Sequence, residues 1–418
     1  MIEKKINKYF PYILIYMCYY TNLPIKLEEL IMILFIIWCV LEKKVFGLKL
    51  NLKILGLIGS LGLVSLIQSY KNSYPINRVI EQIVIIGVMF MGYDLLFKKY
   101  GYRKLFRIYL RITYFICLLA IVQLIAYFFL KIDILRYPIG CNIRELPTLG
   151  SRIARVRSIA YEPGWFAQTL IPSVIYSFEV LIKSKRFQKK YIVIIIVFFM
   201  TMSTGALAVI PVYFLLTKLK GLKQILITTP IIVLVTYLTR EVWLSRVEDT
   251  ISSLKYLSKG LFYNINASSF AILSNLYVAL NNNSLFFGVG LGNHPYSYFR
   301  NFINRKIGVY HFYGLNAMDA YSLLTRMISE TGLFFSIVII LYITFNVNLK
   351  NNIKSLINIG AFCGILSFLI RGGLYTRFGT AFIIMLFFYT KKNSKNSRYT
   401  SRRYKVVKEV KNGLNNIS

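Results

Sequence analysis

The chain of 418 residues has few of the side chains that build metal centres and disulfide frameworks. It contains only two histidines and five cysteines, and no Asp-x-Asp pair occurs. The sequence therefore does not indicate a metal cluster, a disulfide scaffold or a cation-dependent sugar-nucleotide transferase, and we expect neither a metal nor a cofactor. Four of the cysteines lie inside apolar runs, where a thiol acts as a small hydrophobic group.

Charge is also scarce, and it is unbalanced. Charged residues make up 16% of the chain, against about a quarter in a typical soluble domain. The 51 lysines and arginines outnumber the 16 acids, so the net charge is +35. The mean hydropathy of +0.56 excludes a single soluble domain, and 31 Phe with 32 Tyr exclude a disordered chain. Because the positive charge falls between membrane-length apolar segments, we do not expect nucleic-acid binding.

The apolar runs predict an all-α polytopic membrane protein. A helix needs roughly 20 apolar residues to cross a bilayer, with some tolerance. The stretch 191–217 is interrupted at Ser203-Thr204-Gly205 and predicts a hairpin of two short helices, which gives about twelve spans, with eleven as the alternative. The other predicted spans lie near 9–23, 27–41, 52–69, 79–97, 108–130, 163–182, 224–239, 329–347, 355–370 and 377–390.

The distribution of lysine predicts the orientation of these spans. Lysine-rich segments flank 191–217 on both sides, and positively charged loops stay in the cytoplasm, so both termini are expected inside. We expect one membrane domain over 1–390, with external loops near 131–162 and 240–328. The basic segment 391–418 is predicted to be a cytoplasmic tail that contacts anionic lipid.

Arginine is distributed across the membrane differently from lysine. In this topology the cytoplasmic segments hold 25 Lys and 6 Arg, whereas the external segments hold 6 Lys and 13 Arg. The densest point is Arg152, Arg155 and Arg157, close before Glu162. Guanidinium groups bind phosphate through two parallel hydrogen bonds, so we expect this cluster to hold a pyrophosphate at the membrane face. The alternative is a set of interfacial arginines paired with Glu162, which is itself a candidate cap, clamp or general base.

The external loop 240–328 contains a glycine-rich run at Gly288, Gly290 and Gly292. No strand is predicted before it and no Gly-Lys-Ser/Thr follows, so a nucleotide loop is not indicated. We expect a tight turn that allows close approach of two backbone segments. Both histidines, His294 and His311, lie in the same external loop. A lone histidine in a loop is usually structural, whereas the position of both histidines on the side of the arginines is a weak indication of function.

Ionisable residues gather where this loop enters the next span. Arg326 and Glu330 are four residues apart and are predicted to pair on one helix face, with Asp319 two turns earlier. Ionisable residues at a membrane boundary are candidates for function, and the alternative is an ion pair that anchors the interface. Arg371 and Arg377 flank a Gly-Gly turn and are expected to join the same positive rim.

Taken in order, these motifs resemble the O-antigen polymerase and O-antigen ligase superfamily, Wzy and WaaL. Tyr321 and Ser322 stand where the ligases carry His-Asn, and Thr204 stands where an arginine is frequent, so the resemblance favours a polymerase, with His311 as a candidate to compensate. The matching segments are Arg155–Ser158 with Glu162-Pro163, Met202–Leu207, Leu285–Asn293 and Tyr321–Gly332.

This resemblance implies a membrane-embedded glycosyltransferase of GT-C-like architecture in the bacterial plasma membrane. Such a polymerase joins undecaprenyl-pyrophosphate-linked oligosaccharide repeat units into O-antigen, capsular or exopolysaccharide, and undecaprenyl pyrophosphate leaves. Membrane lipid, a chain-length regulator and a flippase are the other expected partners. The implied catalytic residues are Arg155, Arg157, Glu162, Asp319 and Glu330, and the implied substrate-binding residues are Arg152, Gly288, Gly290, Gly292, His311, Tyr321 and Arg326.

Two other functions stay open at the level of sequence. A ligase of the same superfamily transfers finished glycan to another acceptor, and a flippase or transporter moves the lipid-linked oligosaccharide across the membrane. Transporters usually contain repeated halves and a central broken-helix site, and the sequence indicates neither. External aromatic residues, including Tyr296 and Phe299, are expected either to stack on sugar faces or to form an interfacial belt.

Overall fold

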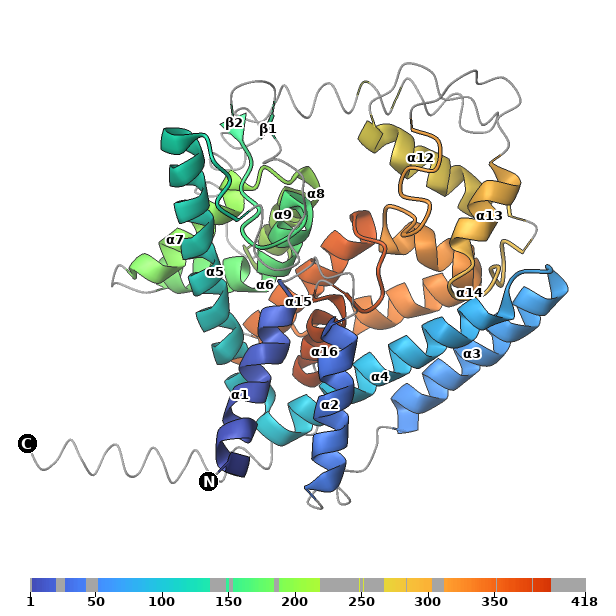
Figure 1. Ribbon diagram of the computed structural model, residues 1–418, viewed down its shortest axis with the longest axis horizontal. Helices are drawn as coiled ribbons and strands as arrows, with labels where there is room; N and C mark the ends of the chain where they lie inside the picture. Colours follow the sequence, from blue (N-terminus) through green and yellow to red (C-terminus); the bar gives the residue numbers. More distant parts are fainter. Residues whose placement is uncertain are drawn as a thin grey trace, which may run out of the picture.

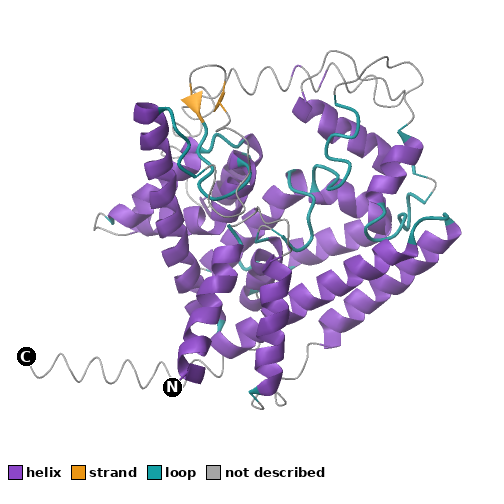
Figure 2. Cartoon of the chain, in the orientation of Figure 1, coloured by secondary structure: helices purple, strands orange, loops and turns teal. Residues whose placement is uncertain are grey.

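The computed structural model describes most of the membrane part of the chain (Figures 1 and 2). The predicted span 224–239, the residues Arg152 and His311 and the predicted tail after Lys391 lie outside the described residues. The described residues are 2–19, 27–42, 52–135, 148–149, 153–183, 188–218, 248, 251, 267–282, 284–302, 312–350, 352–377 and 379–391.

Within these ranges the fold is helical, apart from one short antiparallel ladder between β1 (Thr148–Leu149) and β2 (Ile153–Ala154). The helices are α1 (Ile2–Met17), α2 (Leu27–Leu41), α3 (Leu52–Lys71), α4 (Ile76–Tyr100), α5 (Tyr102–Leu130), α6 (Pro163–Lys183), α7 (Lys189–Met200), α8 (Thr204–Leu207), α9 (Val209–Lys218), α12 (Ala267–Leu280), α13 (His294–Asn301), α14 (Leu323–Phe345), α15 (Ile353–Ile370) and α16 (Thr380–Thr390).

Six of the described helices are long and apolar enough to cross a membrane, namely α3, α4, α5, α6, α14 and α15. Large apolar side chains on them point outward, such as Ile67 on α3 and Phe129 on α5, which are 64% and 75% exposed. Such surface is stable against lipid but not against water. The protein is therefore a polytopic helical membrane protein.

The centre of the bundle is formed by α6, α15 and α16. In the apolar stretches of α6 and of α15, 67% of the residues are buried, against 17% in the apolar stretch of α3. Helix α3 therefore lies at the periphery. In Figure 1 the hairpin of α3 and α4 extends away from this centre, while α1, α2 and α5 stand beside it. The ladder of β1 and β2 and helix α12 lie at the opposite edge of the view from the N-terminus.

The predicted interruption within 191–217 is confirmed. Helix α7 ends at Met200, Met202 has a positive φ of 47°, and Ser203 precedes α8. The helices before and after this interruption pack on different partners: α7 contacts α5 and α6, whereas α9 contacts α15.

Part of the predicted external loop 240–328 has a hydrophobic core of its own. Phe270 and Leu273 of α12 pack with Tyr298 of α13, Phe302 and Ala317. The prediction of an external loop over 240–328 missed α12, an apolar helix of 14 residues that packs against α14. In the range 242–257, where apolar residues recur at helical spacing, only residues 248 and 251 are described.

The glycine-rich turn docks into a break in α14. The backbone of α14 is non-helical at Gly332, where φ is 81°. The freed carbonyl groups accept new partners: Val289 N donates to Ser329 O at 2.9 Å, and Gly290 N donates to Glu330 O at 3.0 Å. The prediction of a tight turn with close backbone approach is confirmed, and the turn fixes the first part of α14.

Two glycines make this approach sterically feasible. A Cβ atom at Gly288, where φ is 78°, would lie 2.3 Å from Glu330 O. A Cβ atom at Gly332 would lie 2.2 Å from Phe286 O. Both contacts are with backbone atoms, which cannot move aside as a flexible side chain would.

We predict that Gly288→Ala and Gly332→Ala each destabilise the folded protein by more than about 1 kcal/mol, through backbone strain and steric overlap. The measurement is thermal unfolding in detergent, followed by the yield of monodisperse protein. Gly59→Ala on α3 is the matched control, because no atom lies within 4 Å of the added Cβ. Equal melting temperatures for all three variants would contradict the docking role of the turn.

Candidate functional site

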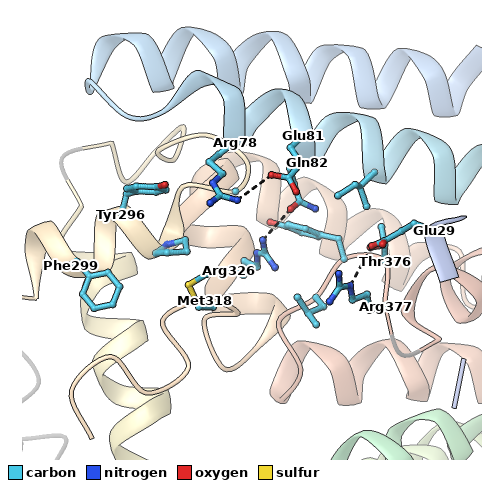
Figure 3. Close-up of a pocket in the computed structure, with 15 residues that line it drawn as sticks. Glu29, Arg78, Glu81, Gln82, Tyr296, Phe299, Met318, Arg326, Thr376 and Arg377 are labelled. Carbon is cyan, nitrogen blue, oxygen red and sulfur yellow. Dashed lines mark hydrogen bonds and ion pairs between the residues drawn. The ribbon is translucent and has the colours of Figure 1, made fainter. Parts of the chain in front are cut away.

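A cavity of about 420 Å³ opens where five parts of the chain meet (Figure 3). Its walls come from the first turn of α2, the start of α4, helix α13, the start of α14 and the connection between α15 and α16. Among the described residues, three arginines line it: Arg78, Arg326 and Arg377. In Figure 3, Tyr296 and Phe299 lie at one end of this pocket, Glu29 and Arg377 lie at the other, and Arg326 lies between them.

Arg326 is the most firmly held of the three arginines. Its Nε donates to Glu330 Oε1 at 2.9 Å, which confirms the predicted pair, and its Nη1 donates to the carbonyl of Gly373 at 2.9 Å. Its Nη2 lies 3.4 Å from Gln82 Oε1, and the guanidinium lies 4.8 Å from the centre of the Tyr375 ring. Because four neighbours fix the head group, it is oriented before any ligand arrives.

Glu330 stands behind Arg326 and away from solvent, with a side chain that is 0% exposed. Its second oxygen, Oε2, and the Tyr375 hydroxyl are both buried. Burial and the nearby Glu330 charge raise the pKa of Tyr375 well above its usual value, so this phenol stays protonated. The pocket wall therefore combines a fixed cation with a protonated hydroxyl.

The other two arginines also have acidic partners. Arg377 Nε lies 3.3 Å from Glu29 Oε1, and this pair joins the start of α2 to the α15–α16 connection. Arg78 Nη1 lies 3.2 Å from Glu81 Oε2, and both belong to α4. The Arg78 pair is well exposed, at 49% and 43%, whereas the Glu29 side chain is only 9% exposed.

A second polar cluster adjoins the pocket without lining it. Arg371 lies 3.4 Å from Glu162, at the start of α6, and its guanidinium covers the ring of Tyr321. Asp319 accepts hydrogen bonds from the Asn316 side chain and from Tyr321 N. Burial raises the pKa of the Asp319 carboxyl above its usual value, although these hydrogen bonds and Arg326 lower it. Of the predicted site residues, Glu162, Asp319 and Tyr321 come together here.

The predicted arginine cluster lies elsewhere. The Arg157 side chain is 2% exposed, and its Nη2 lies 2.9 Å from Asp133 Oδ2. Asp133 also accepts a hydrogen bond from the side chain of Gln123 on α5, and the Gln123 side-chain oxygen accepts one from Ser158 N. These contacts attach the segment that contains Arg157 and Ser158 to α5. Arg155 is partly buried, and its Nε donates to the carbonyl of Thr201. Neither Arg155 nor Arg157 lines the pocket.

The glycine run contributes support rather than an open loop. Of its three glycines only Gly292 lines the pocket, while Gly288 and Gly290 lie against backbone atoms of α14 and α3. His294 follows the run and is buried, with Nδ1 2.8 Å from Ser329 Oγ and Nε2 2.8 Å from Asn275 Oδ1. The Asn275 amide nitrogen already donates to carbonyls, so its oxygen accepts from Nε2–H.

Several pocket residues were not identified from the sequence. Glu29 follows Glu28 in the first turn of the apolar helix α2. A carboxylate at the boundary of a membrane span is a candidate functional residue, and this was the one feature of the sequence that could have identified Glu29. Arg78 was visible only as one of the external arginines, and Gln82 and Tyr375 carried no signal. Among the described residues no three His, Cys, Asp or Glu side chains gather so as to hold a metal ion.

Fold and site together define a polytopic helical membrane protein with a polar, arginine-lined pocket among the ends of its helices. Comparisons with protein-family models, with curated proteins and with solved structures find no match to this chain.

We predict that Arg157→Ala destabilises the protein by about 3–5 kcal/mol, because it leaves the charge of Asp133 buried and unpaired. The measurement is thermal unfolding in detergent. Arg157→Met combined with Asp133→Leu removes both charges and should recover much of the loss. A single variant as stable as the wild type would contradict the structural role of this ion pair.

The buried His294 makes stability depend on pH. Burial, with Arg326 adding to it, lowers the pKa of His294 from 6.5 to about 3, so the folded protein keeps the ring neutral. The contribution of this neutral, buried ring to the free energy of unfolding is complete above pH 6.5 and is lost as the pH falls towards 3.

We therefore expect the unfolding free energy to fall between pH 6.5 and 5, by up to about 1.4 kcal/mol per pH unit from this group. Chemical unfolding of wild type and His294→Gln across this range provides the measurement. The variant should show the shallower pH slope, and identical slopes would rule out a buried neutral histidine.

Proposed function

We propose that the protein is a bacterial membrane glycosyltransferase that polymerises lipid-pyrophosphate-linked oligosaccharide repeat units. The observation that carries this proposal is the convergence of three arginines with Tyr296 and Phe299 in one cavity among helix ends. The order of motifs that resembles the O-antigen polymerase and ligase superfamily supports it. The proposed architecture is GT-C-like, with about twelve spans.

The chemistry requires fixed positive charge at the leaving group. As the bond from the anomeric carbon to the pyrophosphate breaks, negative charge develops on the departing oxygen. Cations that are already oriented lower this barrier without reorganisation. Arg326 meets this condition through its contacts with Glu330 and Gly373. In the proposal, Arg326 and Arg377 take the part that the sequence assigned to Arg155 and Arg157.

The opposite end of the pocket suits sugars. Tyr296 and Phe299 are 39% and 51% exposed, so part of each side chain is accessible to a ligand. The nearby Arg78 and Glu81 offer planar donor and acceptor groups, which suit the hydroxyls of a glycan. A pocket of mixed aromatic and polar lining is typical of small-molecule sites.

The predicted topology is consistent with an outward-facing pocket. The pocket residues come from the starts of α2, α4 and α14, from α13 and from the α15–α16 connection. The distribution of lysine predicts each of these positions on, or next to, the external side. We propose a plasma-membrane location with cytoplasmic termini and with lipid-linked substrate entering from the outer leaflet.

We predict that Arg326→Lys lowers the polymerisation rate by about 100- to 1,000-fold, because an ammonium group cannot reproduce the guanidinium contacts. The measurement is chain elongation by purified protein in lipid nanodiscs supplied with undecaprenyl-pyrophosphate-linked repeat units. Arg107→Lys, at an exposed position on α5, is the matched control and should elongate normally. Normal elongation by Arg326→Lys would contradict the assigned role.

Deletion of the gene separates the related functions. Loss of a polymerase leaves surface glycan of a single repeat. Loss of a ligase instead leaves long chains unattached, and loss of a flippase traps the lipid-linked unit inside the cell. Either of the last two outcomes would overturn the proposal.

A further inference from the structure

We propose that Glu29, in the first turn of α2, is the general base that takes the proton of the acceptor hydroxyl. The inference rests on the proposed polymerase function and names a catalytic residue for it. Only two carboxylates, Glu29 and Glu81, belong to the described residues that line the pocket. The choice of base therefore begins with these two.

The other acids are occupied or lie away from the pocket. Glu330 is fully buried and holds Arg326. Glu162 pairs with Arg371, and Asp319 is bound by Asn316 and Tyr321 N, and neither of them lines the pocket. Glu81 pairs with Arg78 on the exposed surface of α4, where water competes for both groups.

Glu29 differs from these acids in its surroundings. Its side chain is 9% exposed, yet its only ion-pair contact among the described residues is the 3.3 Å contact from Oε1 to Arg377. Its second oxygen, Oε2, is buried without a hydrogen-bond partner in the described part of the chain. The neighbouring Glu28 accepts from the Tyr93 hydroxyl instead. A buried carboxylate oxygen without a partner is costly for stability, and it retains a free lone pair that can accept a proton.

Arg377 links this base to the arrival of the donor. Its side chain is 39% exposed, so a pyrophosphate in the pocket can reach the guanidinium that Glu29 now contacts. Each phosphoryl group of the lipid-linked pyrophosphate carries one negative charge, so the pyrophosphate as a whole carries more charge than one carboxylate, and it binds guanidinium in a bidentate manner. Binding of the donor therefore competes with Glu29 for Arg377. Release from Arg377 makes the Glu29 carboxylate available to accept a hydrogen bond from the acceptor hydroxyl, so the base becomes available only when the donor is present.

The acceptor hydroxyl gives its proton to a carboxylate oxygen of Glu29 while the hydroxyl oxygen forms the bond to the anomeric carbon. The bond between that carbon and the pyrophosphate oxygen breaks, and the electron pair leaves with the lipid pyrophosphate, beside Arg326 and Arg377. Glu29 then returns the proton to solvent.

The test compares Glu29→Gln with wild type in elongation and in binding of inorganic pyrophosphate. We expect the turnover number to fall at least about 100-fold, the usual contribution of a general base, with little change in KM. Pyrophosphate should bind as tightly as in wild type or more tightly, because the competing carboxylate charge is gone. Glu29→Asp keeps a carboxylate and should be more active than Glu29→Gln.

Glu179→Gln on α6 is the matched control, because this buried carboxylate does not line the pocket and the amide oxygen of glutamine can still accept from the Tyr213 hydroxyl. Turnover of Glu29→Gln within about threefold of wild type would overturn the inference, since a general base contributes far more. Loss of pyrophosphate binding together with turnover would also overturn it and would indicate a structural role. If wild type elongates no glycan, the proposed function itself fails, which is a distinct result.

Discussion

The buried pair of Arg326 and Glu330 is the interaction on which the pocket depends. Taking two charges out of water costs several kcal/mol for each ion, and a good pair geometry only partly offsets this. Here Gly373 O, Gln82 and the Tyr375 ring complete the surroundings of the guanidinium. Removal of either charge would leave the other buried and unpaired.

The same pair depends on the break in α14. At Gly332 the helix loses its regular hydrogen bonds, and the glycine turn takes over the freed carbonyls of Ser329 and Glu330. His294 adds a contact from the start of α13 to Ser329. The turn, the break and the ion pair therefore form one unit, which explains why a glycine-rich segment lies so near a charged site.

The site exists only in the folded chain. Glu29 and Arg377 are 348 positions apart, and Gln82 and Arg326 are 244 positions apart. No local pattern indicates such contacts, because they follow from helix packing. What the sequence could indicate was periodic or local: the apolar spans, the break near Ser203, the tight glycine turn and the pairing of Arg326 with Glu330.

The arginine cluster shows where local reasoning reached its limit. The spacing of Arg155 and Arg157 indicates a concentrated positive charge, but it does not reveal an internal partner. Asp133 lies just beyond α5 and had no evident role in the sequence, yet it pairs with Arg157 at 2.9 Å. Helix α12 was missed for a related reason, since a polar surrounding segment hid a short apolar helix that packs on α14.

The central claim is that the pocket around Arg326 holds the lipid pyrophosphate during sugar transfer. The most direct measurement is photocrosslinking with an undecaprenyl-pyrophosphate-linked glycan that carries a photoreactive group next to the pyrophosphate, followed by peptide mass spectrometry. The account predicts adducts on the start of α14 and on residues 374–377, with competition by unlabelled donor. Adducts confined to residues 153–162 would contradict it and would return the pyrophosphate site to the arginine cluster before α6.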